Sequence, residues 1–184
     1  APAAESDVST LSETETKAED TELLPDIPKL DFEGRTFTIL TSGLNDTNGK
    51  DWITYDVYAE SINGEPINDA MYQRTTTVQD NANVTIEPVV VAADMRGGQK
   101  PLGNSVTAGT NDYDLVCMSA YSSCNALISG YFQNLNAIQN LDLSKPWWDQ
   151  YSVDEFSFKD AIFQVTGDIS IGDNEQTFCV YFNK

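Results

Sequence analysis

The stretch RTFTILTS at residues 35–42 decides the fold. Its β-branched and aromatic side chains alternate, which predicts a strand that ends at the small-residue turn Ser42-Gly43. A second run of this kind is VTIEPVVV at residues 84–91. It contains Pro88, which has no amide proton for a sheet ladder, so this run is expected at a sheet edge or a strand end.

The residues between these two runs have the spacing of a helix. Glu65-Pro66-Ile67 begins it, because proline is tolerated at the first helical position and Glu65 favours the positive end of the helix dipole. The apolar residues at helical spacing are expected to pack in the core: Ile67, Met71, Val78 and Ala82. Strand, helix and strand form a βαβ unit, which requires parallel strands and a right-handed crossover.

The rest of the chain continues this alternation more weakly. YDLVCM at residues 113–118 is a continuous apolar run and predicts a buried parallel strand. The other expected elements are a glycine- and proline-punctuated loop over 97–103, a weak helix near 104–110, a turn over 119–123, a short helix over 125–129, and short strands over 161–166 and 177–182. The fold class is therefore predicted as α/β, a three-layer sandwich around a mostly parallel sheet.

Charge divides the chain into two parts. The net charge is −19. The first 33 residues carry ten acids and two lysines, a net of −8, and the remaining 151 carry 19 acids and eight bases, a net of −11. The first part is too poor in apolar residues to offset the entropy of ordering, so residues 1–33 are predicted to be a disordered acidic tether. Residues 34–184 are predicted to be one domain.

Composition also excludes several kinds of site. The chain has no histidine, which excludes Ser-His-Asp triads, Cys-His dyads and histidine-ligated zinc. An isoelectric point near 4.1 without a basic cluster argues against nucleic acid and anionic lipid as partners. Two carboxylate pairs, Asp112 with Asp114 and Asp154 with Glu155, are best interpreted as solvated faces in so acidic a chain. No catalytic residue, metal or cofactor is therefore predicted.

Three cysteines, Cys117, Cys124 and Cys179, occur without CxxC spacing. Each has apolar or small neighbours, so buried free thiols are favoured over a disulfide.

The candidate ligand-binding residues are Ser42, Trp52, Ser119, Tyr121 and Asp168. Most of them lie at or near the expected carboxyl ends of parallel strands, where open α/β sheets bind ligands. Hydroxyls and a carboxylate can form hydrogen bonds, and flat aromatic faces suit a neutral polar ligand such as a sugar. Trp147 and Trp148 fit a core position and a ligand-binding position equally well.

Six segments in order resemble a known family: GRTFTIL at 34–40, residues 64–86, NDYDLVCMSA at 111–120, LDLSKPWWDQ at 141–150, VTGDIS at 165–170 and FCVYFNK at 178–184. The chain resembles the N-terminal lobe of an extracellular solute-binding protein of an ABC importer, of the two-lobed periplasmic-binding-protein-like type II and the lipoprotein type of Gram-positive bacteria.

The resemblance implies a protein without enzymatic activity. It implies a lobe that ends at a crossover to a second lobe, with Phe182, Asn183 and Lys184 at the hinge. It also implies a lipid anchor on the extracellular face of the cell membrane, permease transmembrane subunits as partners, and a small solute as ligand. The aromatic residues and the low content of basic residues favour a carbohydrate as that solute. Two other interpretations stay open from the residues alone: a glycan-active hydrolase that uses paired carboxylates, and a surface adhesin or sensor module.

Overall fold

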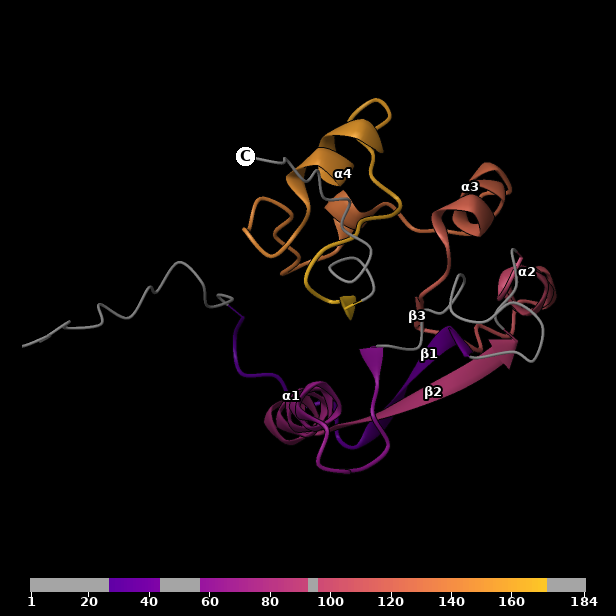
Figure 1. The fold of residues 1–184 in the computed structure, drawn as a ribbon. Coiled ribbons are helices and arrows are strands. Elements are labelled where there is room, and N and C mark those ends of the chain that lie inside the picture. Colours follow the sequence, from indigo (N-terminus) through magenta and orange to yellow (C-terminus); the bar gives the residue numbers. More distant parts are fainter. Residues whose placement is uncertain (1–26, 44–56, 93–95, 172–184) are drawn as a thin grey trace, which may run out of the picture.

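The computed structural model describes residues 27–43, 57–92 and 96–171 (Figure 1). The elements follow the order β1 (Arg35–Gly43), α1 (Pro66–Ala82), β2 (Val84–Ala92), α2 (Gln99–Ala108), β3 (Leu115–Val116), α3 (Ala120–Ile128), the 3-10 helix η3 (Leu135–Ala137) and α4 (Gln150–Glu155). The described chain is thus α/β, with a small open sheet and helices between its strands.

The three strands form a parallel sheet in the order β2-β1-β3. Arg35 pairs with Val84 at the start of the β1–β2 ladder, and Ile39 pairs with Leu115 in the β1–β3 ladder. The predicted βαβ unit is therefore confirmed. The prediction from Pro88 is confirmed as well, because β2 is an outer strand of this sheet.

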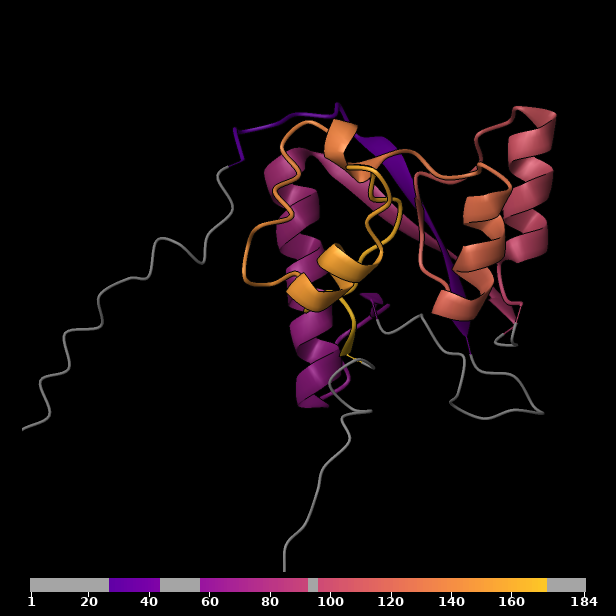
Figure 2. The same cartoon turned by 90° about the horizontal axis from the view of Figure 1, so that it is seen from above.

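Helix α1 lies on one side of the strands, and α2 and α3 lie on the other (Figure 2). Leu40 in the central strand is fully buried and packs with Leu102 of α2 and Ala126 of α3. Alternation along β1 directs Ile39, which is 7 % exposed, toward the opposite side. The central strand therefore contributes buried side chains to both sides of the sheet.

The predicted core stripe of α1 is wrong in part. Met71 and Ala82 are half-buried, but Ile67 and Val78 are 53 % and 46 % exposed, and the fully buried residue of the helix is Thr75. The helix is rotated because polar side chains on its inner face form specific hydrogen bonds. Asn68, for example, donates to the carbonyl of Ser61 at 2.7 Å.

Helix α2 begins at Gln99, within the segment predicted as a loop. Pro101 stands in the first turn, where the amide proton that it lacks would have no helical partner. Helix α3 also begins early, at Ala120, because Ser119 caps it by accepting a hydrogen bond from the amide of Ser122. The third strand is shorter than predicted, and both of its residues are half-buried.

The segment after α3 has little regular structure. No strand forms over 161–166, where a single bridge joins Ala161 to Phe158, while Gln150–Glu155 form α4. Trp147 and Trp148 are half-buried, and Trp148 bridges to Gly167. The strand predicted at 177–182 lies outside the described residues.

The end of the acidic lead-in is hydrogen-bonded to the end of α1. Phe32 N donates to the carbonyl of Ala82 at 2.9 Å, and Asn83 Nδ2 donates to Asp31 Oδ1 at 2.7 Å. The amide of Glu33 also donates to Asp31, and this bond is the main reason that the pKa of Asp31 lies below its ordinary value. Residues 1–26 lie outside the described part.

Cys117 and Cys124 are free thiols, half-buried and exposed respectively. The prediction of burial is wrong for Cys124, because this residue lies on the outer face of α3 between Tyr121 and Ile128, which are both exposed. Cys179 lies outside the described residues.

Candidate functional site

The strand order creates a switch point at the carboxyl ends of β1 and β3. The chain that follows β1 leads to α1 on one side of the sheet, whereas the chain that follows β3 enters α3 on the other side. Between two such strands the connections diverge, and in open α/β sheets a ligand crevice forms there. We call this region the switch edge and define it by Ser42, Gly43, Met118, Ser119 and Tyr121.

Ser42 lies at the end of the central strand and is 2 % exposed. Alternation places its side chain on the same side as Leu40, toward α2 and α3. The side chain of Ser42 is therefore buried below the surface of the switch edge.

Ser119 reaches the switch edge from the neighbouring strand. The amide of Cys117 donates to the carbonyl of Leu40 at 2.8 Å, so the residues after β3 emerge beside those after Leu40 in β1. The Ser119 hydroxyl accepts from Ser122 N at 3.4 Å and lies 3.3 Å from Ser122 Oγ. Tyr121, in the next turn, is 53 % exposed and offers a free ring face.

Helix α2 also begins near this edge. Its cap, Gly98, has φ +81° and lies close to Met118 and Leu40, so that an added Cβ would stand 3.4 Å from Met118 Cε and 3.6 Å from Leu40 Cδ2. Two helices, α2 and α3, therefore direct their N-termini to the carboxyl side of the sheet. The first turn of a helix has backbone N–H groups without intrahelical partners and a partial positive charge, and both favour oxygen atoms of a ligand.

Three of the predicted ligand residues follow the neighbouring strands β1 and β3 on the same edge of the sheet: Ser42 ends β1, Ser119 caps α3 after β3, and Tyr121 lies in the first turn of α3. The side chain of Asp168 is exposed, and its backbone amide donates a hydrogen bond to the carbonyl of Trp147 at 2.9 Å. The next residue, Ile169, accepts a hydrogen bond at its carbonyl from Arg74 of α1 at 3.5 Å, so this segment lies against α1. Trp52 and the predicted hinge residues, Phe182, Asn183 and Lys184, lie outside the described residues.

The carboxylate pairs named above form hydrogen bonds and an ion pair within the fold or lie exposed on the surface. Asp114 Oδ2 accepts a hydrogen bond from Thr38 N at 2.9 Å, and its other oxygen pairs with Arg35. Asp112 accepts from the hydroxyl of Thr110 at 2.7 Å. Asp154 and Glu155 are exposed in the last turn of α4. Among the described residues, no three acids or cysteines are grouped so as to hold a metal ion.

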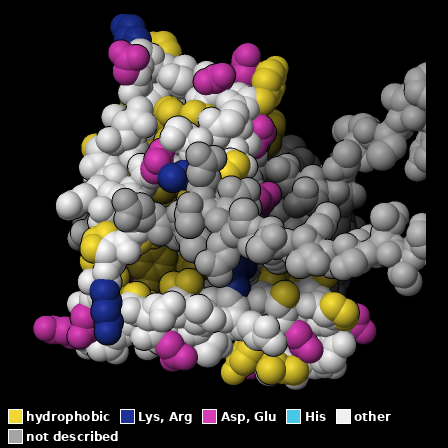
Figure 3. Space-filling view, turned by 90° about the vertical axis from the view of Figure 1, so that its left-hand side faces the viewer, with side chains coloured by type: hydrophobic (Ala, Val, Ile, Leu, Met, Phe, Trp, Pro, Cys, Tyr) yellow, Lys and Arg dark blue, Asp and Glu magenta, His cyan; other side chains and the backbone are white. Residues whose placement is uncertain are grey.

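Acidic side chains are spread over the surface (Figure 3). Asp and Glu appear at many separate positions on the face shown there, with few Lys or Arg between them. A long-range field of this kind disfavours anionic partners over the whole face without marking one site.

Two hollows lie outside the switch edge and were not predicted from the sequence. One, of about 490 Å³, lies between residues 58–68 and strand β2. The other, of about 520 Å³, lies between α2 and the end of α3 and is lined by Arg96, Lys100 and Tyr131 among others. For the first hollow, the dipeptide Asn63-Gly64 in the sequence indicated a turn. The sequence did not indicate which strand faces this turn, because that depends on the fold.

Within the described part of the chain, no helix combines the length and apolar character needed to cross a bilayer. A scan against models of protein families and searches of curated proteins and of solved structures found no match to the chain.

Proposed function

We propose that this chain is the first lobe of a two-lobed extracellular solute-binding protein, which delivers a small solute to the permease of an ABC importer. In this proposal the solute is a carbohydrate. The supporting observation is the switch edge, where Ser42 ends β1, and Ser119 and Tyr121 follow the neighbouring parallel strand β3, whose connection diverges from that of β1. In this proposal the sheet is the centre of a three-layer, type II periplasmic-binding-protein-like lobe, and a lipid anchor holds the protein on the extracellular face of the membrane.

The chemistry at the switch edge favours binding over reaction. Hydroxyl groups and the N-termini of α2 and α3 can donate hydrogen bonds to ligand oxygens, and the exposed ring of Tyr121 can stack against the apolar face of a sugar. The Ser119 hydroxyl is engaged by Ser122, and the chain has no histidine to act as its general base. A second lobe that closes over this edge would complete the contacts and present the solute to the permease.

The proposal is tested on the full-length protein from the complete reading frame by calorimetric titration with a panel of saccharides. Replacing both Ser119 and Tyr121 by alanine is expected to weaken saccharide binding at least about tenfold, because each removes a direct ligand contact. Tyr151→Ala is the matched control, since Tyr151 is also an exposed tyrosine in the first turn of a helix, α4. Equal affinities for the double variant and the wild type would reject the switch edge as the binding site.

A further inference from the structure

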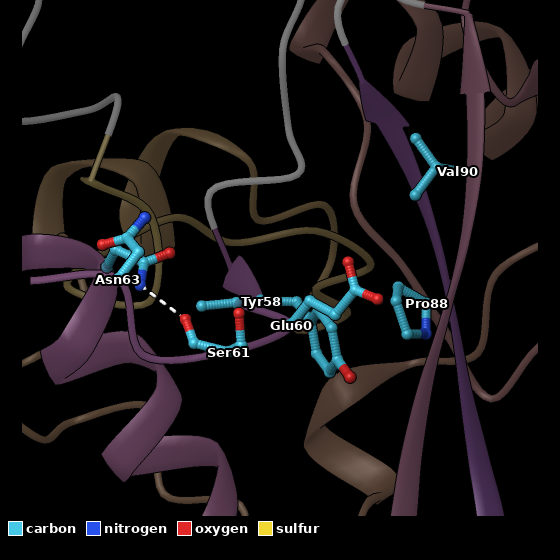
Figure 4. Close-up of a pocket in the computed structure, with 8 residues that line it drawn as sticks. Tyr58, Glu60, Ser61, Asn63, Pro88 and Val90 are labelled. Atoms are coloured by element: carbon cyan, nitrogen blue, oxygen red, sulfur yellow. Dashed lines mark hydrogen bonds between the residues drawn. The ribbon is translucent and has the colours of Figure 1, made fainter. Parts of the chain in front are cut away.

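The hollow beside β2 has two different walls (Figure 4). One wall is the segment before α1 with the first turns of the helix, and the other is the outer strand of the sheet. We call it the β2 hollow, and its lining residues are Tyr58, Ala59, Glu60, Ser61, Asn63, Asn68, Pro88 and Val90. Its volume of about 490 Å³ lies in the usual range for small-molecule sites.

Side chains of α1 hold the first wall in position. Arg74 Nη2 donates to the carbonyl of Val57 at 2.7 Å, and Asn68 Nδ2 donates to the carbonyl of Ser61 at 2.7 Å, the bond drawn dashed in Figure 4. Asp69 Oδ1 accepts from the amides of Asn63 at 3.0 Å and Gly64 at 3.3 Å. A wall tied to one helix at several points is preorganised, so a ligand would not have to order it on binding.

The lining combines an apolar surface with neutral and acidic oxygen and amide groups. Tyr58 is half-buried, and Val90 is an apolar strand residue left 51 % exposed. Glu60, Ser61 and the asparagines add acceptors and donors, and among the described residues no lysine or arginine lines the hollow. A carboxylate without a lining cation disfavours anionic ligands, whereas the hydroxyls and C–H faces of a neutral sugar fit both kinds of surface.

The β2 hollow adjoins the switch edge through one contact. A Cβ placed on Gly43 would stand 2.6 Å from Val90 Cγ1, so the side chain of Val90 covers the position where a side chain of Gly43 would be. Gly43 directly follows Ser42 at the end of the central strand. Among the described residues, the hollow and the switch edge thus adjoin at Gly43 and Val90, on the side of the sheet opposite to the Ser42 side chain.

We propose that the β2 hollow is a second sugar subsite, so that the ligand is an oligosaccharide and not a monosaccharide. This inference rests on the proposed function, because the first sugar unit would occupy the switch edge. The subsite adds a ring-stacking surface at Tyr58, an acceptor at Glu60 and an apolar floor at Pro88 and Val90.

The test is a series of titrations of the ¹⁵N-labelled chain followed by NMR. The probes are mono-, di-, tri- and tetrasaccharides of glucose, galactose and xylose in both α- and β-linked forms. The amides of Ala59 and Val90 are expected to shift with oligosaccharides but not with monosaccharides. Tyr58→Ala and Glu60→Gln are each expected to weaken oligosaccharide binding about tenfold and to leave monosaccharide binding unchanged.

Matched controls exist on α4. Tyr151→Ala and Glu155→Gln change an exposed tyrosine and an exposed glutamate that lie outside both sites, and neither is expected to alter binding. Equal effects of Tyr58→Ala and Tyr151→Ala would overturn the subsite.

The outcomes separate the two proposals. Shifts at Ser119 and Tyr121 without shifts at Ala59 and Val90 would overturn the subsite and support the switch edge. Shifts confined to Ala59 and Val90 would support a sugar site in the hollow and overturn the proposed function of the edge. Binding of spermidine at the hollow, with every saccharide inactive there, would overturn the sugar assignment.

Discussion

The side-chain Oε1 of Gln79 accepts a hydrogen bond from the backbone amide of Ile86 at 2.8 Å, which ties α1 to the outer strand of the sheet. An amide engaged by a helix side chain is not available to another strand. Two residues farther along the same edge, Pro88 has no amide proton at all. Two successive outward positions of β2 therefore cannot pair with a further chain, which is how natural sheets protect an exposed edge.

Giving residues 86 and 88 free backbone amide protons should allow the edge of β2 to pair with a second molecule. The double variant Gln79→Ala with Pro88→Thr is expected to self-associate with rising concentration, and loss of the Gln79 bond alone should cost about 1 kcal/mol of stability. Light scattering after size-exclusion chromatography measures the first effect, and urea unfolding measures the second. Gln73→Ala removes an exposed glutamine from the same helix and should stay monomeric. A double variant that is equally monomeric would contradict this account of the edge.

Gly167 is expected to tolerate no side chain. A Cβ there would lie 2.2 Å from the carbonyl oxygen of Trp147 and 2.9 Å from the Cα of Trp148, and these backbone atoms cannot rotate away. Gly167→Ala should therefore destabilise the protein by about 1–3 kcal/mol, the usual cost of overpacking. The midpoint of urea unfolding measures the change.

Gly103→Ala is the control for that substitution. Its Cβ would meet the side chain of Tyr131 at 3.3 Å, a contact that a small ring movement relieves. Inside α2, alanine is favoured over glycine by up to about 1 kcal/mol, so the net effect should be near zero. Equal destabilisation by both substitutions would show that the Trp147 contact does not limit position 167.

Protonation of Asp69 at low pH should weaken the hydrogen bonds that hold the loop before α1. The amide of Asn63 donates to this carboxylate and holds its pKa below the ordinary value of 3.8. Because the pKa is lower in the folded state, the stabilisation is fully present above 3.8 and is lost as the pH falls through the folded pKa. The protection factors of the Asn63 and Gly64 amides against hydrogen exchange should therefore fall as the pH drops through the folded-state pKa of Asp69.

Two variants check this assignment. In Asp69→Asn, the protection factors of the Asn63 and Gly64 amides should be low already at neutral pH and should not fall further in acid. Asp80→Asn removes an acid near the other end of α1 and should keep the response. A response that persists in Asp69→Asn would assign the acid sensitivity to another group.

The 184-residue chain should bind saccharides only weakly by itself, in the millimolar range or above. In the proposed function it supplies half of the contacts around the solute, and a single open edge leaves much of a ligand in water. Calorimetry of this chain beside the full-length protein measures the difference. Equally tight binding by both would contradict the half-cleft.

Sequence patterns predicted correctly those features that depend on the residues of one element alone. Pro66 marked the start of α1, Pro88 marked the edge strand, and the alternation in 35–42 marked the central strand. These features depend on backbone dihedral angles, missing amide protons and side-chain alternation, which the residues carry with them.

Signals that depend on a distant partner failed. Ile67 and Val78 matched a core stripe, yet Asn68 and Gln79 face inward because the loop and strand β2 offer hydrogen-bond partners to them. Helix α2 starts before Pro101 despite three nearby glycines, and AIFQVT at 161–166 forms no strand because no neighbouring strand pairs with it within the described chain.

The sequence by itself determined the parallel βαβ unit and the acidic, histidine-free surface chemistry. Only the tertiary structure decided which carboxyl ends meet, because the order β2-β1-β3 follows from long-range packing around Leu40 and not from any local pattern. That order places the residues that follow β3, Ser119 and Tyr121, on the same edge of the sheet as Ser42 at the end of β1. It also brings Val90 over Gly43, a contact between residues distant in sequence that depends on strand register.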